Sequence, residues 1–338
     1  MKAIRFHAHG ELDVLRYEDV PDPEPRPGEV IVRVRGCALN HLDLFQRRGI
    51  PDVPLPHSPG SDVAGEVIRT TVPEVDEGLR VMLQPGLSCG RCRACLAGED
   101  NLCASYDIIG YRSEGGYAEL VRAPAGNVIP LPAHVGFPEA AAFPLTFVTA
   151  WHMLITRARL RVGETVLVIA AGSGVGQAAI QVARLHGAKV IATAGSGTKL
   201  ERARELGAHD VINHYTQDVA AEVRELTSRR GVDVVCEHVG QATWMAVTKC
   251  LARGGRLVTC GATTGPKVSI DLRHLFAKQQ SLIGSYMGTK AELLQAAALF
   301  FEGQLRPVVD RVFPLADAAK AQARLEEKAH FGKIVLEP

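Results

Sequence analysis

One stretch, VLVIAAGSGVGQAAIQVARLHG at residues 166–187, constrains the fold more than any other. It reads as a buried strand, a glycine-rich turn and a helix, an arrangement whose backbone amides and helix N-terminus bind pyrophosphate. The letters do not match G-x-G-x-x-G in register, because Ala171 and Ser173 hold the first two glycine positions counted back from Gly176. Gly172 and Gly174 lie beside those positions. The strand before and the helix after favour a dinucleotide loop over a purely structural turn.

The pattern of apolar residues along the chain changes at about residue 162. Beyond it, six short apolar runs alternate with helical stretches, which predicts an α/β fold with a parallel, doubly wound six-stranded sheet. The runs are GETVLVIAA, AKVIATA, HDVINH, VDVVCEHV, GRLVTCGA and SLIGSYM. Before it, short alternating runs such as EVIVRVRG between Pro and Gly predict an irregular, mostly antiparallel β-rich domain.

Beyond about residue 284 the chain carries an amphipathic stretch, TKAELLQAAALFFEGQL, and a last apolar run, GKIVLE. We expect both to return to the β-rich domain, which makes that domain discontinuous. The predicted division is therefore 1–148 with 284–338 for the β-rich domain, and 149–283 for the nucleotide-binding domain.

Composition narrows the classes of partner. The 338 residues, 46% of them hydrophobic, are enough for two cores. The 38 basic and 37 acidic residues form no long run of one sign, which argues against nucleic acid and acidic membranes as partners and favours a small-molecule substrate. No signal peptide or membrane-spanning stretch is visible, so we expect a cytoplasmic protein.

The end of the second strand predicts which nucleotide is bound. An NAD site carries Asp or Glu about 20 residues beyond the glycine loop, for the ribose hydroxyls. Here AKVIATAGSGTKLERA offers no acid at the strand end, and Ser196, Lys199 and Arg202 instead offer a hydroxyl and positive charge to a 2′-phosphate. This favours NADP(H), although Lys199 and Arg202 also fit the solvated face of the following helix.

Four of the eight cysteines lie in CGRCRACLAGEDNLC, residues 89–103. The spacing C-x2-C-x2-C-x7-C predicts that Cys89, Cys92, Cys95 and Cys103 bind one Zn²⁺ tetrahedrally. Because four protein ligands leave no open position for water or substrate, this zinc is expected to be structural. Arg91 and Arg93 offset part of the thiolate charge. The scattered cysteines, Cys37, Cys236, Cys250 and Cys260, are expected to be buried thiols.

With these motifs in place, the chain resembles the medium-chain dehydrogenase/reductase superfamily along essentially its whole length. The segments NHLDLFQRRG, LPHSPGSDVAGEV, PLTFVTAW, IAAGSGVGQAAIQ, GAHDVINH and FGKIVL are most similar to the quinone oxidoreductase branch, and the four-cysteine loop resembles that of zinc alcohol dehydrogenases. The resemblance implies a GroES-like catalytic domain, a Rossmann domain and a nicotinamide cleft between them.

Zinc alcohol dehydrogenases also bind a catalytic zinc, and the resemblance places its three ligand positions at Asn40, Ser61 and Leu145. None of these side chains is a usual zinc ligand, so we expect the usual catalytic zinc to be absent, with only the neighbouring acid kept as Asp62. A rebuilt metal site is an alternative. It would draw on His41, His57, Asp62 and His152.

Without such a Lewis acid, a conjugated acceptor is the easier substrate, because the charge left by hydride is delocalised and a hydrogen-bond donor can stabilise it. We predict Asn40 as the contact to the substrate oxygen, with His41 as a second donor. The alternatives are that Asn40 only caps the helix beginning at His41, and that His41 packs or binds cofactor phosphate.

Further cofactor contacts are carried over from the resemblance, position by position. His214 stands where quinone oxidoreductases often have tyrosine, and its partly protonated ring would suit a 2′-phosphate. Ser285, Met287 and Lys333 are the weaker candidates. The predicted cofactor-binding set is Thr149, Gly172, Gly174, Val175, Gly176, Ser196, Lys199, His214, His238, Val239, Gly240, Cys260, Gly261, Ala262, Ser285, Met287 and Lys333.

The sequence thus predicts an NADP(H)-dependent oxidoreductase that transfers hydride to a conjugated carbonyl or quinone and holds one structural Zn²⁺ per chain. An alcohol dehydrogenase acting on primary or secondary alcohols is the first alternative, and a nucleotide-binding protein without catalysis is the second. The apolar run SLIGSYM is suited to pairing across a two-fold axis, so a homodimer or homotetramer is expected.

Overall fold

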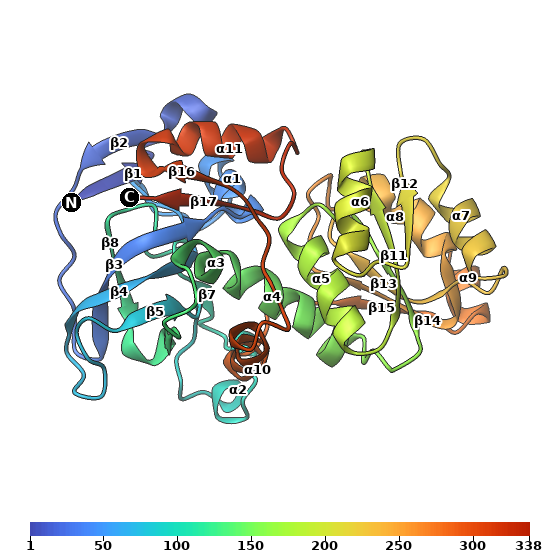
Figure 1. Ribbon diagram of the computed structural model, residues 1–338, viewed down its shortest axis with the longest axis horizontal. Coiled ribbons are helices and arrows are strands. Elements are labelled where there is room, and N and C mark those ends of the chain that lie inside the picture. The colour runs from blue at the N-terminus through green and yellow to red at the C-terminus, as the bar shows by residue number, and fades with distance from the viewer. The chain divides into compact units, whose positions relative to one another are not determined.

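The computed structural model describes residues 1–338 and divides into two compact units (Figure 1). Unit 1 comprises Met1–Leu145 and Thr289–Pro338, and unit 2 comprises Thr146–Gly288. The sequence prediction placed the two breaks after residues 148 and 283. The chain leaves unit 1 inside helix α4 (Pro144–Trp151) and returns just before helix α10 (Lys290–Phe301).

Unit 2 contains the parallel six-stranded sheet that the apolar runs predict. Its strand order is β12-β11-β10-β13-β14-β15, and every neighbouring pair is parallel. The order reverses beside β10, which is where a doubly wound sheet binds its ligand. The strands are β10 (Thr165–Val168), β11 (Lys189–Ala194), β12 (Asp210–Asn213), β13 (Val232–Glu237), β14 (Leu251–Thr259) and β15 (Ser281–Gly284).

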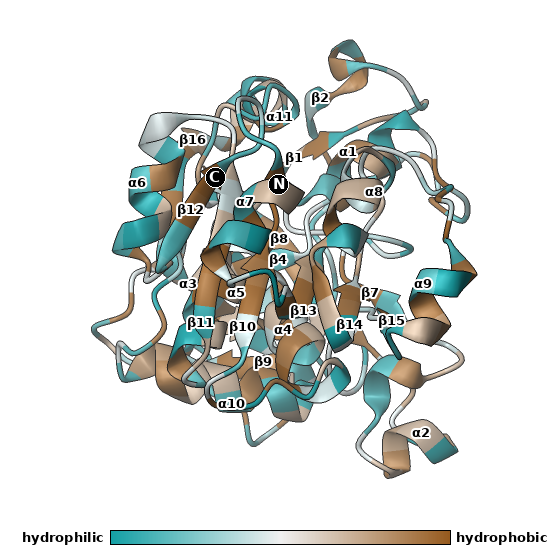
Figure 2. Cartoon of the chain, turned by 90° about the vertical axis from the view of Figure 1, so that its right-hand side faces the viewer, coloured by the Kyte–Doolittle hydropathy of each residue, from teal (hydrophilic) through white to brown (hydrophobic).

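Helices follow these strands and bury their apolar faces on the sheet. Ala220 and Val223 of α7, with Trp244 and Val247 of α8, join strand side chains such as Leu167 in one core. In Figure 2 the central strands are largely hydrophobic, whereas α6 carries many hydrophilic residues. The helices of unit 2 are α5 (Gly174–Leu185), α6 (Gly197–Glu205), α7 (Val219–Leu226), α8 (Gln241–Lys249), α9 (Leu272–Ala277) and the π-helix His152–Arg157, which continues α4.

Unit 1 is built around a mostly antiparallel sheet of order β16-β17-β3-β4-β5-β9, with β8 paired to β3. Only β16 and β17 are parallel to each other. The mostly antiparallel β-rich domain that the sequence predicts is thus present. The strands are β3 (Glu29–Ala38), β4 (Asp62–Thr70), β5 (Arg80–Leu83), β8 (Leu120–Pro124), β9 (Val128–Pro130), β16 (Val309–Pro314) and β17 (Lys333–Glu337).

Two small ribbons and several helices complete unit 1. The start of α10 is fixed by its own sequence: the Thr289 hydroxyl accepts from the Glu292 amide at 3.2 Å, and the Glu292 carboxylate accepts from the Thr289 amide at 2.7 Å. The other elements are β1 (Lys2–Arg5) with β2 (Arg16–Asp19), β6 (Gly86–Leu87) with β7 (Asp107–Ile108), α1 (His41–Arg48), α2 (Arg93–Leu96), α3 (Phe137–Ala142), α11 (Ala318–Glu326) and 3₁₀ turns at 12–14, 100–102, 125–127 and 315–317.

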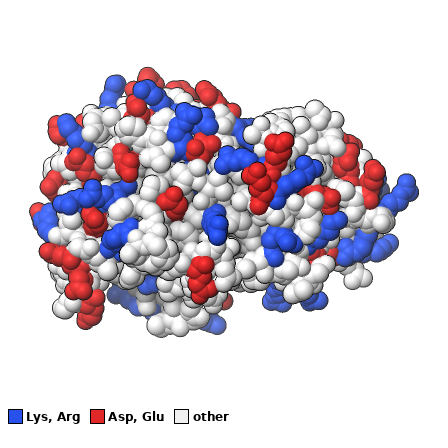
Figure 3. Space-filling view, viewed as in Figure 1, with Lys and Arg blue, Asp and Glu red and all other residues white.

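Charged side chains of both signs are interspersed on the face drawn in Figure 3. That face carries no large area of one sign, in keeping with the nearly equal numbers of basic and acidic residues. None of the helices combines the length and apolar composition needed to cross a membrane.

Candidate functional site

Three strand ends meet at one place in unit 1. Asp62, the first residue of β4, lies opposite Ala38, the last residue of β3. Val335 of β17 pairs with the same Ala38 from the other side, and the Leu39 amide donates to the Ile334 carbonyl at 2.9 Å. The register therefore brings together the residues that precede and follow these strand ends.

A buried polar network results, formed by Asn40, Asp62 and Lys333. The Lys333 ammonium donates to Asp62 Oδ2 at 2.8 Å and to Asn40 Oδ1 at 2.7 Å, and Asn40 Nδ2 donates to Asp62 Oδ2 at 2.9 Å. The other Asp62 oxygen, Oδ1, accepts the Leu145 amide at 2.8 Å. The exposed fractions are 7% for Asn40, 0% for Asp62 and 3% for Lys333, so the ion pair is shielded from water.

The network continues below Asn40 through a second buried acid. Asp43 Oδ2 accepts the Asn40 backbone amide at 2.8 Å and the Tyr117 hydroxyl at 2.9 Å. Burial raises the pKa of the Asp43 carboxyl to about 6, even though these hydrogen bonds favour the charged form. Burial also raises the pKa of Tyr117 well above its usual value, so its hydroxyl stays a donor. Asp43 was not among the residues predicted from sequence, although N-x-x-D before a helix is a capping pattern.

Asn40 stands at the N-cap of α1, as one of the alternatives expected. Asn40 and Asp43 have the arrangement of a capping box, and the Asn40 side chain is also engaged by Lys333 and Asp62. His41 is the first residue of α1, half-buried, with its ring 6.4 Å from that of Phe45. The roles of Asn40 and His41 toward substrate stay predictions.

The donors proposed for a rebuilt metal site are largely engaged elsewhere. His57 is fully buried and its Nε2 lies 3.0 Å from the Gly110 carbonyl, while both Asp62 oxygens accept hydrogen bonds. Burial lowers the pKa of His57, as expected for a neutral core imidazole. Ser61, which the resemblance places at a zinc-ligand position, is fully buried and its hydroxyl has no partner within the protein.

In unit 2 the glycine loop closes on the first turn of α5. Ser173 Oγ caps the helix by accepting the Gly176 amide at 2.9 Å. A Cβ on Gly176 would lie 2.3 Å from the Ala170 carbonyl oxygen, so only glycine allows the helix to approach the strand this closely. The amides of Gly174 and Val175 lie in the first turn, before α-helical hydrogen bonding begins. Amides at this position of a helix are suited to binding a phosphate.

Beside this loop, the residues after β13 and β14 are tied to one another. His238 Nε2 lies 2.8 Å from Ser173 Oγ, and burial lowers the pKa of His238 to about 4, so its ring is neutral. Glu237, fully buried, accepts the Val239 and Gly240 amides at 2.8 and 2.9 Å and the Thr259 hydroxyl at 3.2 Å. Sequence reasoning named the His238–Gly240 run but missed Glu237, which sits at the end of an apolar run.

The loop after β14 approaches the backbone of Gly240 closely. Gly240 has φ +91°, and a Cβ there would lie 2.8 Å from the Gly265 carbonyl oxygen and 2.9 Å from Ala262 Cα. Cys260 and Gly261 precede that contact, and the Cys260 amide donates to the Glu237 carbonyl at 3.3 Å. Three residues predicted to bind the cofactor, Cys260, Gly261 and Ala262, thus belong to one loop that packs on the start of α8.

The residues predicted to face the adenosine end of the cofactor follow β11 and β12. Ser196 Oγ accepts the Lys199 amide at 3.4 Å and thus caps α6, on which Lys199 and Arg202 lie. His214 Nδ1 lies 3.4 Å from the Thr193 hydroxyl. These groups follow the ends of β11 and β12, where the sequence predicts the 2′-phosphate site.

The remaining predicted contacts lie in three places. Thr149 is 4% exposed in α4, and the Ser285 amide donates to the Thr259 carbonyl at 2.9 Å just beyond β15. Met287 has a positive φ of 52° and is buried. The resemblance predicts Lys333 as a cofactor contact. Its ammonium donates hydrogen bonds to Asp62 and Asn40 in this structure. Its contact with cofactor stays a prediction.

The four-cysteine loop brings its sulfur atoms together. All four Sγ atoms lie within 4.8 Å of one another, with Cys92–Cys95 at 3.5 Å and Cys89–Cys95 at 4.0 Å. Tetrahedral Zn–S bonds of about 2.3 Å place sulfurs about 3.8 Å apart, so the set fits zinc. The Cys89 amide is the main group that lowers the pKa of Cys103, to about 6. Asp100, inside the loop, accepts the Lys290 amide at 3.1 Å and so joins the loop to α10.

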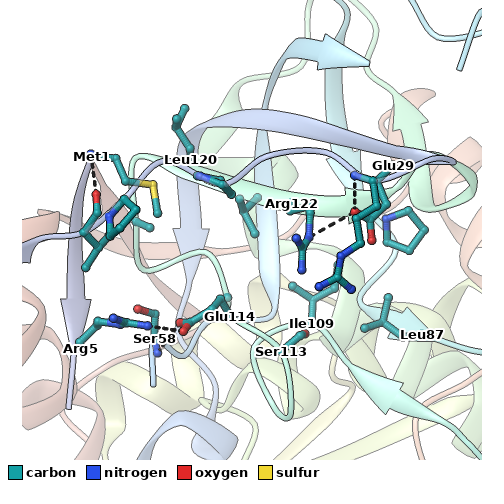
Figure 4. Close-up of a pocket in the computed structure, with 18 residues that line it drawn as sticks. Met1, Arg5, Glu29, Ser58, Leu87, Ile109, Ser113, Glu114, Leu120 and Arg122 are labelled. Carbon is teal, nitrogen blue, oxygen red and sulfur yellow. Dashed lines mark hydrogen bonds and ion pairs between the residues drawn. The ribbon is translucent and has the colours of Figure 1, made fainter. Parts of the chain in front are cut away.

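Unit 1 also contains a cavity of about 390 Å³ that none of the network residues lines (Figure 4). Two ion pairs line it: Arg5 with Glu114, and Arg122 Nε with Glu29 Oε2 at 3.2 Å. Ser58 donates its amide to Glu114 at 2.9 Å on the Arg5 side. The cavity is therefore a separate feature.

Comparisons with known proteins agree with this architecture. Residues 26–133 match the family model of the alcohol dehydrogenase GroES-like domain, and residues 174–302 match that of the zinc-binding dehydrogenases. The chain is 34% identical to a quinone oxidoreductase of Pseudomonas aeruginosa, over 100% of this chain and 99% of that protein. It is 29% identical to an NAD-dependent alcohol dehydrogenase of Sulfurisphaera tokodaii, over the full length of both. A crystal structure of an NAD-dependent alcohol dehydrogenase superposes with a TM-score of 0.97 at 47% identity, covering 100% of both chains.

Proposed function

Because the chain belongs to the quinone oxidoreductase-like branch of the medium-chain dehydrogenase/reductase superfamily, we propose that it transfers hydride from NADPH to a conjugated carbonyl or a quinone. That it is an NAD(P)-dependent oxidoreductase follows from its relatives. The acceptor and the choice of NADP(H) are the parts proposed.

The observation that carries the proposal is the donor set in unit 1. The three positions that bind catalytic zinc in zinc alcohol dehydrogenases hold Asn40, Ser61 and Leu145, none of which is a usual zinc ligand. Asp62, beside them, is saturated by hydrogen bonds from Lys333, Asn40 and the Leu145 amide. The site thus offers hydrogen-bond donors in place of a Lewis acid, which suits an acceptor whose charge is delocalised.

The chemistry balances without a further reagent. Reduced nicotinamide, when bound, supplies a hydride. Hydride adds to the β-carbon of an enone, the displaced electron pair becomes an enolate on the carbonyl oxygen, and a proton from solvent at the α-carbon gives the saturated carbonyl. In a quinone, the same hydride and one proton give the hydroquinone. The Asn40 amide donates to the oxygen on which the negative charge develops.

For the cofactor, the glycine loop and the first-turn amides of α5 fit a pyrophosphate. The choice of NADP(H) rests on Ser196, Lys199 and His214 and on the lack of an acid at the end of β11. Two relatives are named as NAD-dependent, so the choice needs its own test. Lys199→Ala should raise the KM for NADPH at least tenfold and leave that for NADH within threefold. Equal effects on both would refute the choice.

Cys89, Cys92, Cys95 and Cys103 would hold the structural zinc, which closes the loop and supplies no chemistry. The same thiolate site and the unpaired thiols elsewhere fit a reducing compartment, which supports a cytoplasmic location as part of the proposal.

The function is tested by measuring turnover with NADPH or NADH against quinones and cyclic and acyclic enones, and with NADP⁺ or NAD⁺ against primary and secondary alcohols. The proposal expects the highest kcat/KM for NADPH with a quinone or enone. Tight NADPH binding without turnover of any acceptor would instead identify a nucleotide-binding protein without catalysis.

A second candidate is an alcohol dehydrogenase, favoured by the solved structure of that name at 47% identity. Zinc content per chain, measured on protein purified without chelator or added metal, separates the two. One zinc per chain fits the four-cysteine loop alone. Two, together with chelator-sensitive oxidation of alcohols, would make the alcohol dehydrogenase the better description.

We also propose that the protein forms a homodimer, alone or within a homotetramer, through β15. This strand is the last in its sheet, and the segment before it exposes Ile270, Leu272 and Phe276 by 46%, 66% and 70%. Sedimentation velocity should give a dimer or tetramer for the wild type, and Ile283→Lys in β15 should shift it toward monomer. A monomeric wild type would refute this part.

A further inference from the structure

The side-chain amide of Asn40 lies between two charged groups of opposite sign. Lys333 Nζ is 2.7 Å from its oxygen, and Asp62 Oδ2 is 2.9 Å from its nitrogen. The two charges also bond to each other at 2.8 Å, so the three groups form a closed triangle. Asn40 and Asp62 are 22 residues apart, whereas Lys333 comes from 293 residues further along the chain than Asn40.

The chemistry of these partners fixes which end of the amide faces which group. An ammonium has only donors and therefore requires the amide oxygen, while a carboxylate has only acceptors and requires the NH₂ group. A flipped amide would set NH₂ against the ammonium and oxygen against the carboxylate, and both contacts would be repulsive. Orientation is thus imposed by charge.

Each partner is itself held in place. Asp62 Oδ1 accepts the Leu145 amide at 2.8 Å, and the Lys333 backbone amide donates to the Val308 carbonyl at 2.8 Å. The Asn40 backbone is fixed separately, by the 2.8 Å hydrogen bond from its amide to Asp43. The side-chain amide therefore has little freedom to turn.

One amide hydrogen remains weakly engaged in this arrangement. The first serves Asp62, and the second has only the Ala38 carbonyl at 3.4 Å, at the long limit for a hydrogen bond. Asn40 is also the most exposed of the three, at 7% against 0% and 3%. The ammonium on its oxygen draws electron density from the amide, which makes the N–H groups stronger donors.

We infer that Lys333 and Asp62 are positioning residues: they lock the Asn40 amide in one orientation and leave its second hydrogen for the oxygen of the substrate. The inference rests on the proposed function for the identity of that substrate. In this inference Lys333 acts by orienting the Asn40 amide, a role that differs from its predicted contact with the cofactor.

The lock itself can be tested without turnover. The chain has only four asparagines, Asn40, Asn101, Asn127 and Asn213, so selective ¹⁵N-asparagine labelling gives four side-chain NH₂ groups, and the Asn40 pair is assigned by its loss in Asn40→Asp. The lock predicts two separate proton signals for Asn40 and at least tenfold slower hydrogen exchange than in an unfolded chain for the hydrogen bonded to Asp62. Exchange at the unfolded-chain rate in the wild type would overturn the inference, whatever the enzyme reduces.

Steady-state kinetics then test whether the fixed orientation of the Asn40 amide contributes to catalysis. Lys333→Met, measured with NADPH and the best acceptor, should lower kcat by about 100-fold, the usual effect of losing one oxyanion donor, with the KM for NADPH within twofold of wild type. Lys333→Arg keeps a donor-only cation and should recover at least tenfold of that loss. Lys320→Met, on the 73% exposed Lys320 of α11, is the matched control and should be unchanged.

The outcomes separate the inference from the function on which it rests. A folded Lys333→Met with kcat within threefold of wild type overturns the positioning role while leaving the reductase intact. If Asn40→Leu has kcat within threefold of wild type, Asn40 does not contact the substrate oxygen, and the inference falls with that role. If Lys333→Met does not fold, the wild-type exchange measurement and the Arg variant decide the matter.

Discussion

The network of unit 1 and the glycine loop of unit 2 hold their functional groups by different means. In unit 1, charged side chains from three strand ends meet in a buried triangle whose members lie up to 293 residues apart. In unit 2, backbone amides and a neutral His238 are arranged by a contiguous loop and its neighbours. The first arrangement is therefore sensitive to charge, and the second to the volume of a single Cβ.

The largest expected effect follows from breaking the buried ion pair. Asp62→Ala leaves the Lys333 ammonium buried without its acid, and such a change typically costs about 3–5 kcal/mol. The loss should be confined to unit 1 and appear as faster hydrogen exchange in β3, β4 and β17. Both tryptophans, Trp151 and Trp244, lie in unit 2, so the fluorescence transition should be nearly unmoved.

The control for this change is Asp317→Ala, which removes the half-buried partner of the exposed Lys320 of α11. Its effect should be about 0.5 kcal/mol or less, because exposed pairs contribute little. A similar loss in both variants would show that burial of the pair is not what matters.

The second prediction is that the stabilities of the two units depend on pH in opposite directions. Asp43 has a pKa raised by burial to about 6 from near 3.8, so the folded state binds the extra proton and unit 1 loses stability as pH rises from about 4 to 6. His238 has a pKa lowered by burial to about 4 from near 6.5, so unit 2 loses stability as pH falls from about 6.5 to 4. Each effect is at most roughly 3–3.5 kcal/mol.

Hydrogen exchange of unit 1 and urea unfolding followed by tryptophan fluorescence, at pH 4.5 and 6.5, measure the two slopes separately. Asp43→Asn keeps an oxygen for Tyr117 and should flatten the slope of unit 1 alone, and His238→Gln should flatten that of unit 2 alone. Parallel slopes in the two units would contradict the comparison.

The third prediction tests the volume limit in unit 2. Gly176→Ala places a Cβ 2.3 Å from the Ala170 carbonyl, a backbone atom that cannot turn away. Overpacking of this kind costs about 1–3 kcal/mol, so the fluorescence transition should move to lower urea and NADPH affinity should fall. Gly197→Ala, where nothing lies within 4 Å, should leave the transition unchanged or raise it slightly.

The smallest effect concerns the cap of α5. Ser173→Ala removes the acceptor for the Gly176 amide and the partner of His238, with an expected loss of about 1 kcal/mol from unit 2. Ser196→Ala is the matched comparison, since its capping contact is 3.4 Å long, and it should lose less. Equal losses would mean that the Ser173–His238 contact adds nothing to the cap.

The same contrast explains what the sequence could predict. Both the loop at 166–187 and the cysteines at 89–103 are contiguous, so strand, turn and ligand spacing are readable in one line of text. The alternation of apolar runs gave the parallel sheet for the same reason, because period and spacing are local properties.

The polar network could not be predicted in this way. Asn40, Asp62 and Lys333 were each singled out, but for different reasons, and their meeting depends on the register that sets Ala38 opposite Asp62 and Val335. Register between distant strands is fixed by packing across the whole sheet, which no single segment encodes. Glu237 was missed because an acid at the end of an apolar run reads as a surface residue until the amides that surround it are known.

Unit 2 is inserted between the two parts of unit 1, so the strand that carries Lys333 is synthesised last. During synthesis, β3 and β4 emerge first and β17 emerges only after all of unit 2. Until then the end of β3 near Ala38, which pairs with β17 in the finished sheet, is an open edge. Asn40 and Asp62 are therefore synthesised long before the cation that pairs with them, and the buried triangle can be completed only in a chain translated through residue 333.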